Sequence, residues 1–116
     1  MTAIILINWN GADDTLACLN SLLKADGDFF VVVVDNASTD DSVLRLNEFA
    51  QQHSDKIRID ILALDDNYGF AVGNNKGVQY AMQFAPSSIM LLNNDTEVEP
   101  HFLQELQKFS TEHPEY

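Results

Sequence analysis

The chain has 116 residues, 46% of them apolar, and its six Lys and Arg against eighteen Asp and Glu give a net charge of −12. This length allows one modest core, so we expect a single domain or part of one. The acidic balance leaves no basic stripe for a phosphate backbone and argues against nucleic-acid binding. No apolar run approaches the roughly 18 residues of a membrane span, and no basic leader precedes the first apolar run. We therefore expect a cytoplasmic protein, and peripheral association with the inner face of the membrane is compatible with this expectation.

Four apolar segments are predicted to form β-strands, at residues 3–7, 29–34, 57–64 and 88–92. An amphipathic helix follows each strand. The first helix is expected to be capped by Asp13 or Asp14 and to end near Gly27, and the second to be capped by Ser38 or Thr39.

The third helix is predicted over residues 71–84, and Pro100 suits the first turn of the fourth. The residues expected to be buried on the fourth helix are Phe102, Leu103, Leu106 and Phe109. The order βαβαβαβα implies right-handed crossovers and a mostly parallel, Rossmann-like α/β sheet. Polar residues alternate with apolar ones in the third strand segment, which indicates a position at the edge of the sheet.

Each predicted strand runs into a cluster of Asn, Asp or Gly residues. The clusters occupy residues 8–11, 35–40, 65–69 and 93–96. Because the carboxyl ends of parallel strands lie at one edge of a sheet, the four clusters are expected to converge where such folds bind ligands. The pattern therefore predicts a ligand site before any family is considered.

Asp35 follows four consecutive valines, so its carboxylate is expected at the tip of a buried strand. There it could accept the imide N–H of a pyrimidine base. The alternative is a structural one, because Asp and Asn also initiate turns. That alternative explains the following Ser38, Thr39 and Asp40 more readily than an acid at the strand tip.

Three glycines, Gly69, Gly73 and Gly77, lie where the third strand gives way to a helix. Their spacing differs from the GxGxxG dinucleotide fingerprint. They permit close backbone approach to a ligand, and tight packing of the helix on the sheet is an equally open interpretation. Lys76 could meet a phosphate, although a solvated surface residue is the preferred interpretation.

Asn93, Asn94 and Asp95 follow two leucines that we expect to be buried. Their oxygen atoms are of the kind that Mg²⁺ or Mn²⁺ accepts, with water and substrate phosphate completing the shell. An ordinary Asx turn is the alternative. Trp9 is expected to lie half in the core and half in a pocket wall, and Cys18 is interpreted as a small buried hydrophobic residue without chemistry.

Taken together and in this order, the segments NWNG, VVDNASTD, NYGFAVGNN and LLNNDT resemble family 2 glycosyltransferases of the GT-A fold. The resemblance covers residues 4–103, and the residues of these segments are most similar to those of the rhamnosyltransferase-like branch. It implies the N-terminal, nucleotide-sugar-binding half of a GT-A fold, truncated at its C-terminus. It also implies transfer with inversion from a dTDP- or UDP-sugar, with rhamnose as a candidate sugar, to a growing saccharide or lipid-linked saccharide.

The resemblance also implies roles for nine residues. Asp95 is the expected ligand of Mg²⁺ or Mn²⁺, and Asp35 the partner of the base imide. The full set expected to contact the nucleotide is Asn8, Trp9, Asn10, Asp35, Asn67, Gly69, Asn74 and Asn93. The commonest family pattern has Arg at the position of Asn74 and Asp at that of Asn93, so phosphate neutralisation and metal binding depart from that pattern here.

The general base of such enzymes comes from the second half of the fold, so no catalytic residue is assigned and the 116 residues are expected to be inactive alone. Two other functions remain open. A nucleotide-binding regulatory module would bind without transferring a sugar. A nucleotidyltransferase is disfavoured, because the acidic segment NWNGADD lacks the basic, glycine-rich loop that a triphosphate needs.

Overall fold

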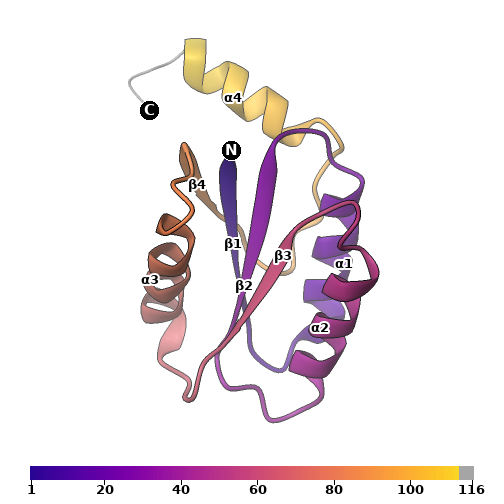
Figure 1. The fold of residues 1–116 in the computed structure, drawn as a ribbon, viewed down its shortest axis with the longest axis vertical. Helices are drawn as coiled ribbons and strands as arrows, with labels where there is room; N and C mark the ends of the chain where they lie inside the picture. Colours follow the sequence, from indigo (N-terminus) through magenta and orange to yellow (C-terminus); the bar gives the residue numbers. More distant parts are fainter. Residues whose placement is uncertain (113–116) are drawn as a thin grey trace.

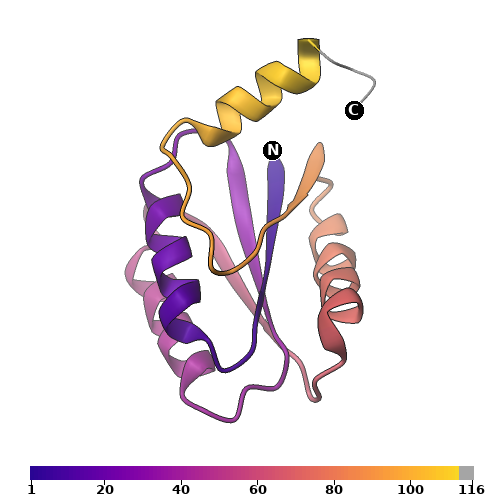
Figure 2. The same cartoon turned by 180° about the vertical axis from the view of Figure 1, so that it is seen from behind.

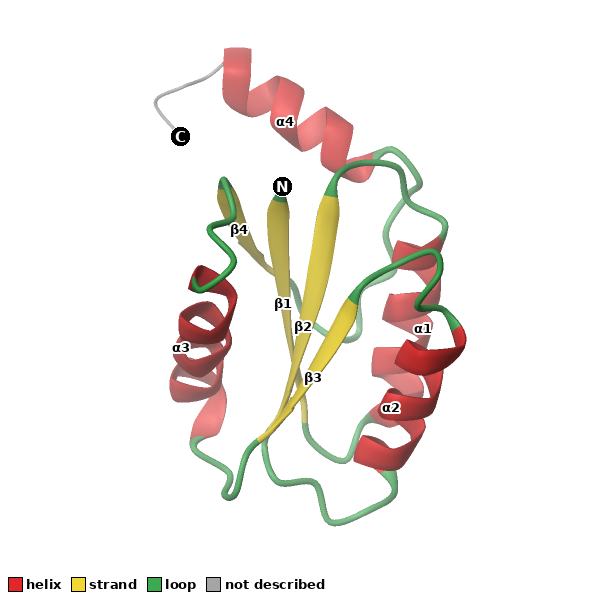
Figure 3. Ribbon diagram, viewed as in Figure 1, coloured by secondary structure: helices red, strands yellow, loops and turns green. Residues whose placement is uncertain are grey.

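The computed structural model describes residues 1–112, which form a four-stranded sheet in the order β3-β2-β1-β4. The strands are β1 (Thr2–Asn8), β2 (Phe29–Asp35), β3 (Ile59–Ala63) and β4 (Ser88–Leu91). Every neighbouring pair is parallel, as Figures 1 and 3 show. This architecture confirms the predicted Rossmann-like α/β fold and the predicted edge position of the third strand.

The helices are α1 (Ala12–Leu23), α2 (Ser42–Gln52), α3 (Gly69–Met82) and α4 (Phe102–Glu112). Helices α1 and α2 cover one face of the sheet and α3 covers the other, which Figure 2 shows from behind. Because side chains alternate across a strand, β1 and β2 supply a separate core to each face. Leu6 and Val33 pack on the α1 and α2 face, whereas Ile5 and Val34 pack on the α3 face. Within residues 1–112, no helix has the length and apolar character needed to cross a membrane.

Helix α3 lies close against the sheet because two of its glycines face the strands. A Cβ atom on Gly77 would lie 2.7 Å from the Cγ2 of Ile5 and 2.8 Å from that of Val34. A Cβ atom on Gly73 would lie 3.0 Å from the Nδ2 of Asn36. Such distances admit no side chain without a shift of the neighbours, so the packing interpretation is confirmed for these two glycines.

Helix α4 lies at the amino-terminal edge of the sheet, beyond the start of β1 (Figure 1). The backbone N–H of Asp26 donates to the carbonyl of Pro100 at 2.7 Å, and Leu103 is buried against Gly27. The cluster-bearing ends of the strands lie at the opposite edge. Helix α4 therefore leaves the predicted ligand edge uncovered.

Both predicted N-caps are wrong. Helix α1 is preceded by Gly11 and α2 by Asp41, and neither position makes a side-chain capping hydrogen bond. Asp13 lies instead in the first turn of α1, where its carboxylate pairs with Arg45 of α2 at 2.7 Å. Ser38 and Thr39 instead form hydrogen bonds with Asn10 in the loop after β1, and these bonds compete with capping of α2.

Other predicted boundaries and burials also differ. Pro100 lies in a turn two residues before α4 begins, and α3 ends at Met82. Leu91 is 55% exposed because β4 forms an edge of the sheet, and Leu106 is 47% exposed on the outer side of α4. The predicted burial of Phe109 concerns a side chain outside the described part of the structure.

Candidate functional site

The carboxyl ends of β1 and β2 meet as predicted, and their last residues are partners in the sheet register, Asn8 opposite Asp35. Both side chains lie on the α1 and α2 face, since Leu6 and Val33, two residues earlier on each strand, pack there. The Nδ2 of Asn8 donates to the Oδ1 of Asp35 at 2.9 Å. The two clusters are thus joined by a buried hydrogen bond.

Asp35 is 1% exposed, and its carboxylate is paired on both oxygens. Oδ1 accepts from Asn8 and from the Oγ of Ser38 at 2.6 Å. Oδ2 accepts from the backbone N–H of Ser38 at 2.9 Å. Because a carboxylate oxygen accepts two hydrogen bonds, Oδ1 is saturated and Oδ2 keeps one acceptor position. Asp35 therefore organises the turn that follows β2 and retains capacity for one further donor.

The buried polar pair continues into α1 and the segment after β4. The hydroxyl of Thr15 donates to the Oδ1 of Asn8 at 2.6 Å, and it accepts from the Nδ2 of Asn94 at 3.0 Å. Asp35, Asn8, Thr15 and Asn94 thus form an unbroken hydrogen-bonded chain, which we call the Asn8 network. It ties together β2, β1, α1 and the loop after β4.

Asn10 holds the loop after β2 from the outside. Its Oδ1 accepts from the backbone N–H of Thr39 at 2.8 Å, and its own N–H donates to the Oγ of Ser38 at 2.9 Å. Its φ of +49° lies in the left-handed region, which Asn adopts more readily than most residues. The side chain predicted to touch the nucleotide is therefore engaged in fixing the loop.

The loop from β3 to α3 turns at Gly69, whose φ is +83°. A Cβ at this glycine would meet no atom within 4 Å, so backbone conformation, not space, requires glycine here. The Oδ1 of Asn67 accepts from the Gly69 N–H at 2.9 Å. Further along α3, Asn74 is only 6% exposed, so the residue at the family's Arg position lies in the interior.

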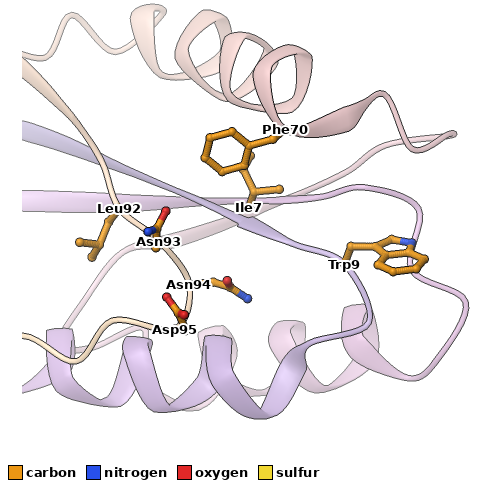
Figure 4. A pocket seen from close by; sticks show the side chains of 7 residues that line it. All are labelled: Ile7, Trp9, Phe70, Leu92, Asn93, Asn94 and Asp95. Carbon is orange, nitrogen blue, oxygen red and sulfur yellow. The ribbon is translucent and has the colours of Figure 1, made fainter.

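A step in the sheet opens a pocket at this edge. β4 ends at Leu91, which pairs with Ile5, whereas β1 continues for three more residues to Asn8. At about 3.3 Å per residue, the cluster after β4 is set back by roughly 10 Å. The resulting pocket of about 320 Å³ is lined by Ile7, Trp9, Phe70, Leu92, Asn93, Asn94 and Asp95 (Figure 4).

Three of the nine predicted residues line this pocket, namely Trp9, Asn93 and Asp95. The other predicted residues do not line the pocket: Asn8 and Asp35 end β1 and β2, Asn10 and Asn67 lie in loops, and Gly69 and Asn74 belong to α3. The prediction missed Phe70, whose ring projects from α3 toward Ile7 (Figure 4). The signal available in the sequence was a large aromatic residue directly after a glycine at a strand-to-helix turn.

The pocket offers amide and carboxylate oxygens but no positive charge. Asp95 is exposed, and it is the only carboxylate among the seven lining residues. Within residues 1–112, no group of three His, Cys, Asp or Glu side chains could hold a metal by itself. The ammonium group of Lys76 lies 4.7 Å from the centre of the Tyr68 ring, whose hydroxyl donates to Asp65. The oxygen donors fit a hard divalent cation whose remaining ligands are water and phosphate.

Cys18 takes no part in this chemistry. It is fully buried in the core beneath α1. Burial raises the pKa of its thiol to about 11, and the negative charges of Asp95 and Glu97 act in the same direction. The thiol is therefore protonated at neutral pH and is not a nucleophile.

Residues 3–116 match the family described as Glycosyl transferase family 2. The chain therefore belongs to this family. A curated relative is the low-salt glycan biosynthesis hexosyltransferase Agl10 of Haloferax volcanii, which is 30% identical over 105 residues, 90% of this chain and 31% of the relative. The chain thus spans about a third of the length of that relative.

Solved structures share the fold. TarS 1-349 of S. aureus in complex with UDP has a TM-score of 0.79 at 24% identity, covering 97% of this chain and 32% of that chain. The mannosyltransferase PcManGT of Pyrobaculum calidifontis, in complex with GDP-Man and Mn²⁺, has a TM-score of 0.70 at 21% identity, covering 81% and 27%. The alternating strands and helices match the N-terminal half of the GT-A glycosyltransferase fold.

The Asn8 network predicts a sharp response to loss of one hydroxyl. Thr15→Val keeps the shape of the side chain but leaves the Oδ1 of Asn8 buried without its donor. We expect the free energy of unfolding to fall by about 1–3 kcal/mol, measured by urea denaturation. Thr15→Ser keeps the hydroxyl and is the matched control. Equal stabilities of the Val and Ser variants would contradict a role for this hydrogen bond.

Proposed function

We propose that the chain is the nucleotide-diphosphate-sugar-binding part of a glycosyltransferase. The donor is a dTDP- or UDP-sugar, with rhamnose as a candidate sugar, and transfer proceeds with inversion to a saccharide or lipid-linked saccharide. The observation that carries the proposal is the pocket at the carboxyl edge, where Trp9 and Phe70 lie with Asn93 and Asp95. The family, a relative named as a hexosyltransferase, and solved structures of similar fold bound to UDP and GDP-Man support it.

In this proposal, Trp9 and Asn93 touch the donor directly, since both line the pocket. The remaining acceptor position on the Oδ2 of Asp35 is proposed to receive the imide N–H of the base. Because this side chain is 1% exposed and lies outside the pocket lining, the contact requires the turn after β2 to move when the nucleotide binds. The remaining predicted residues act on the loops that surround the nucleotide, and the hydrogen bonds of Asn8, Asn10 and Asn67 support this role. The burial of Asn74 favours an indirect contribution from within α3.

Asp95 is proposed as the protein ligand of Mg²⁺ or Mn²⁺, with Asn93 beside it. A diphosphate placed in this pocket would meet a carboxylate and no basic lining residue, in a chain of net charge −12. A divalent cation, when bound, supplies the positive charge that stabilises a departing diphosphate. The Mn²⁺ in the complex of the Pyrobaculum mannosyltransferase supports the proposal.

No residue of the chain is assigned as general base. The proposal places the base and the wall of the acceptor site outside these 116 residues, which span 31% of the hexosyltransferase relative. A regulatory module that binds nucleotide without transferring a sugar is the second candidate. The two functions differ in whether a longer polypeptide carrying this segment transfers sugar.

The role of Asp35 is tested by calorimetric titration of dTDP or UDP. Asp35→Asn removes a charge-assisted hydrogen bond to the base, and we expect a loss of roughly 1.5–3 kcal/mol of binding free energy. Ser38→Ala is the control, because it loosens the same turn while keeping the carboxylate. Equal affinities of wild type and Asp35→Asn, with circular dichroism unchanged, would remove Asp35 from the site.

The metal role is tested by repeating the titration in Mn²⁺, in Mg²⁺ and in chelator. Either cation should tighten diphosphate binding, and Asp95→Ala should abolish that gain while largely sparing binding of the nucleoside. Glu97→Ala is the control, since Glu97 is an exposed acid two residues further along. The metal role is wrong if wild type binds the diphosphate equally well in chelator and in Mn²⁺.

Transfer itself is tested with a labelled donor and an acceptor extract. Because a positioned general base contributes about 10²–10⁴-fold, the 116-residue chain should transfer sugar near background while still binding nucleotide. A polypeptide that continues past Tyr116 in the same reading frame is the positive control. Equal rates for the two would place the base within the chain, and failure of both would favour the regulatory module.

A further inference from the structure

The last strand residue, Asp35, and the residue after it, Asn36, serve opposite faces of the sheet. Asp35 lies on the face covered by α1 and α2, with its carboxylate in the Asn8 network. Asn36 contacts α3 on the other face, where its side chain is 3% exposed. Its backbone N–H donates to the carbonyl of Asn8 at 2.9 Å, so Asn36 is anchored to β1 before its side chain reaches α3.

The side chain of Asn36 holds the first residue of α3. Its Nδ2 donates to the carbonyl of Gly69 at 3.2 Å, while Asn67 accepts from the N–H of the same glycine. Gly69, whose φ is +83°, is thereby held on both of its backbone polar groups. Gly73, one turn later, leaves room for the carboxamide, because a Cβ there would lie 3.0 Å from Nδ2.

Only one end of the Asn36 carboxamide has a partner. The Oδ1 atom is buried and has no hydrogen-bond partner within residues 1–112. A buried acceptor without a partner lowers the stability of the folded chain. A purely apolar side chain of similar size would avoid this penalty, so stability alone does not explain an amide at this position. What the amide adds is the hydrogen bond to Gly69.

Gly69 sets the position of Phe70, the next residue. Phe70 lines the pocket, yet its side chain is 62% exposed, so its surroundings contribute little to holding the ring. The placement of such a ring depends mainly on the backbone that carries it. We propose that Asn36 is a positioning residue that fixes the turn at Gly69 and so holds Phe70 as a wall of the donor pocket.

This inference rests on the proposed binding of a nucleotide diphosphate in the pocket. The test is a double-mutant cycle on the affinity for dTDP or UDP in Mn²⁺, measured by calorimetry. Asn36→Leu is nearly isosteric and removes the donor to Gly69. We expect it to weaken binding about three- to tenfold, the net effect of one hydrogen bond. In the Phe70→Ala background the same substitution should change affinity less than twofold, because the ring it positions is already absent.

Stability is recorded separately by urea denaturation, because a merely structural role would alter unfolding without this coupling. The inference is wrong if Asn36→Leu weakens binding equally in the presence and in the absence of the Phe70 ring. It is also wrong if Asn36→Leu leaves the affinity unchanged. If Asn36→Leu does not fold, Asn67→Ala is the second variant. It removes the acceptor of the Gly69 N–H, and Asn67 is exposed, so the substitution leaves the core intact. Its effect on affinity should show the same dependence on Phe70. Wild type that binds neither nucleotide would refute the proposed function itself, whereas wild type that binds without the coupling refutes only the role of Asn36.

Discussion

The Asn8 network is the interaction on which the arrangement of this site depends. Asn8 lies at the end of β1, a strand with neighbours on both sides, and its amide both donates to Asp35 and accepts from Thr15. A carboxamide that does both joins the turn after β2 to the first helix. Because these groups are buried, each needs its partner, and the loops are held by that requirement.

The pocket exists because the strands end at different levels of the sheet. β1 and β2 end together, whereas β4 ends three residues earlier along the sheet. The segment after β4 therefore crosses the sheet beside Ile7 and reaches α1 through Asn94. The amides of this segment and the Asp95 carboxylate therefore lie further back from the carboxyl edge of the sheet than Trp9 does. A sheet with four equal strands would have no such step.

The two faces of the sheet support the site in different ways. On the face of α1 and α2, paired polar groups hold the turn after β2 and the segment after β4 in place. On the α3 face, close packing at Gly73 and Gly77 brings the helix to the sheet, and the left-handed turn at Gly69 directs Phe70 toward the pocket. Helix α4 packs near Gly27 at the opposite edge of the sheet, away from the pocket.

The order of strands and helices, the parallel sheet and the edge at which the polar clusters meet could all be predicted from the sequence. These features follow from local periodicity and from the chirality of crossovers, which act within short stretches of chain. The position of Asn93 and Asp95 at a strand end could be read in the same way. Which side chains face the pocket depends on the folded arrangement and could not be predicted in this way. Asp35 and Asn10 are turned to hydrogen-bond partners 27 and 29 residues away. Phe70 reaches the pocket because Gly69 is held by Asn36, the residue that follows β2. Such pairings depend on strand register and helix packing, and no local pattern in the chain encodes them.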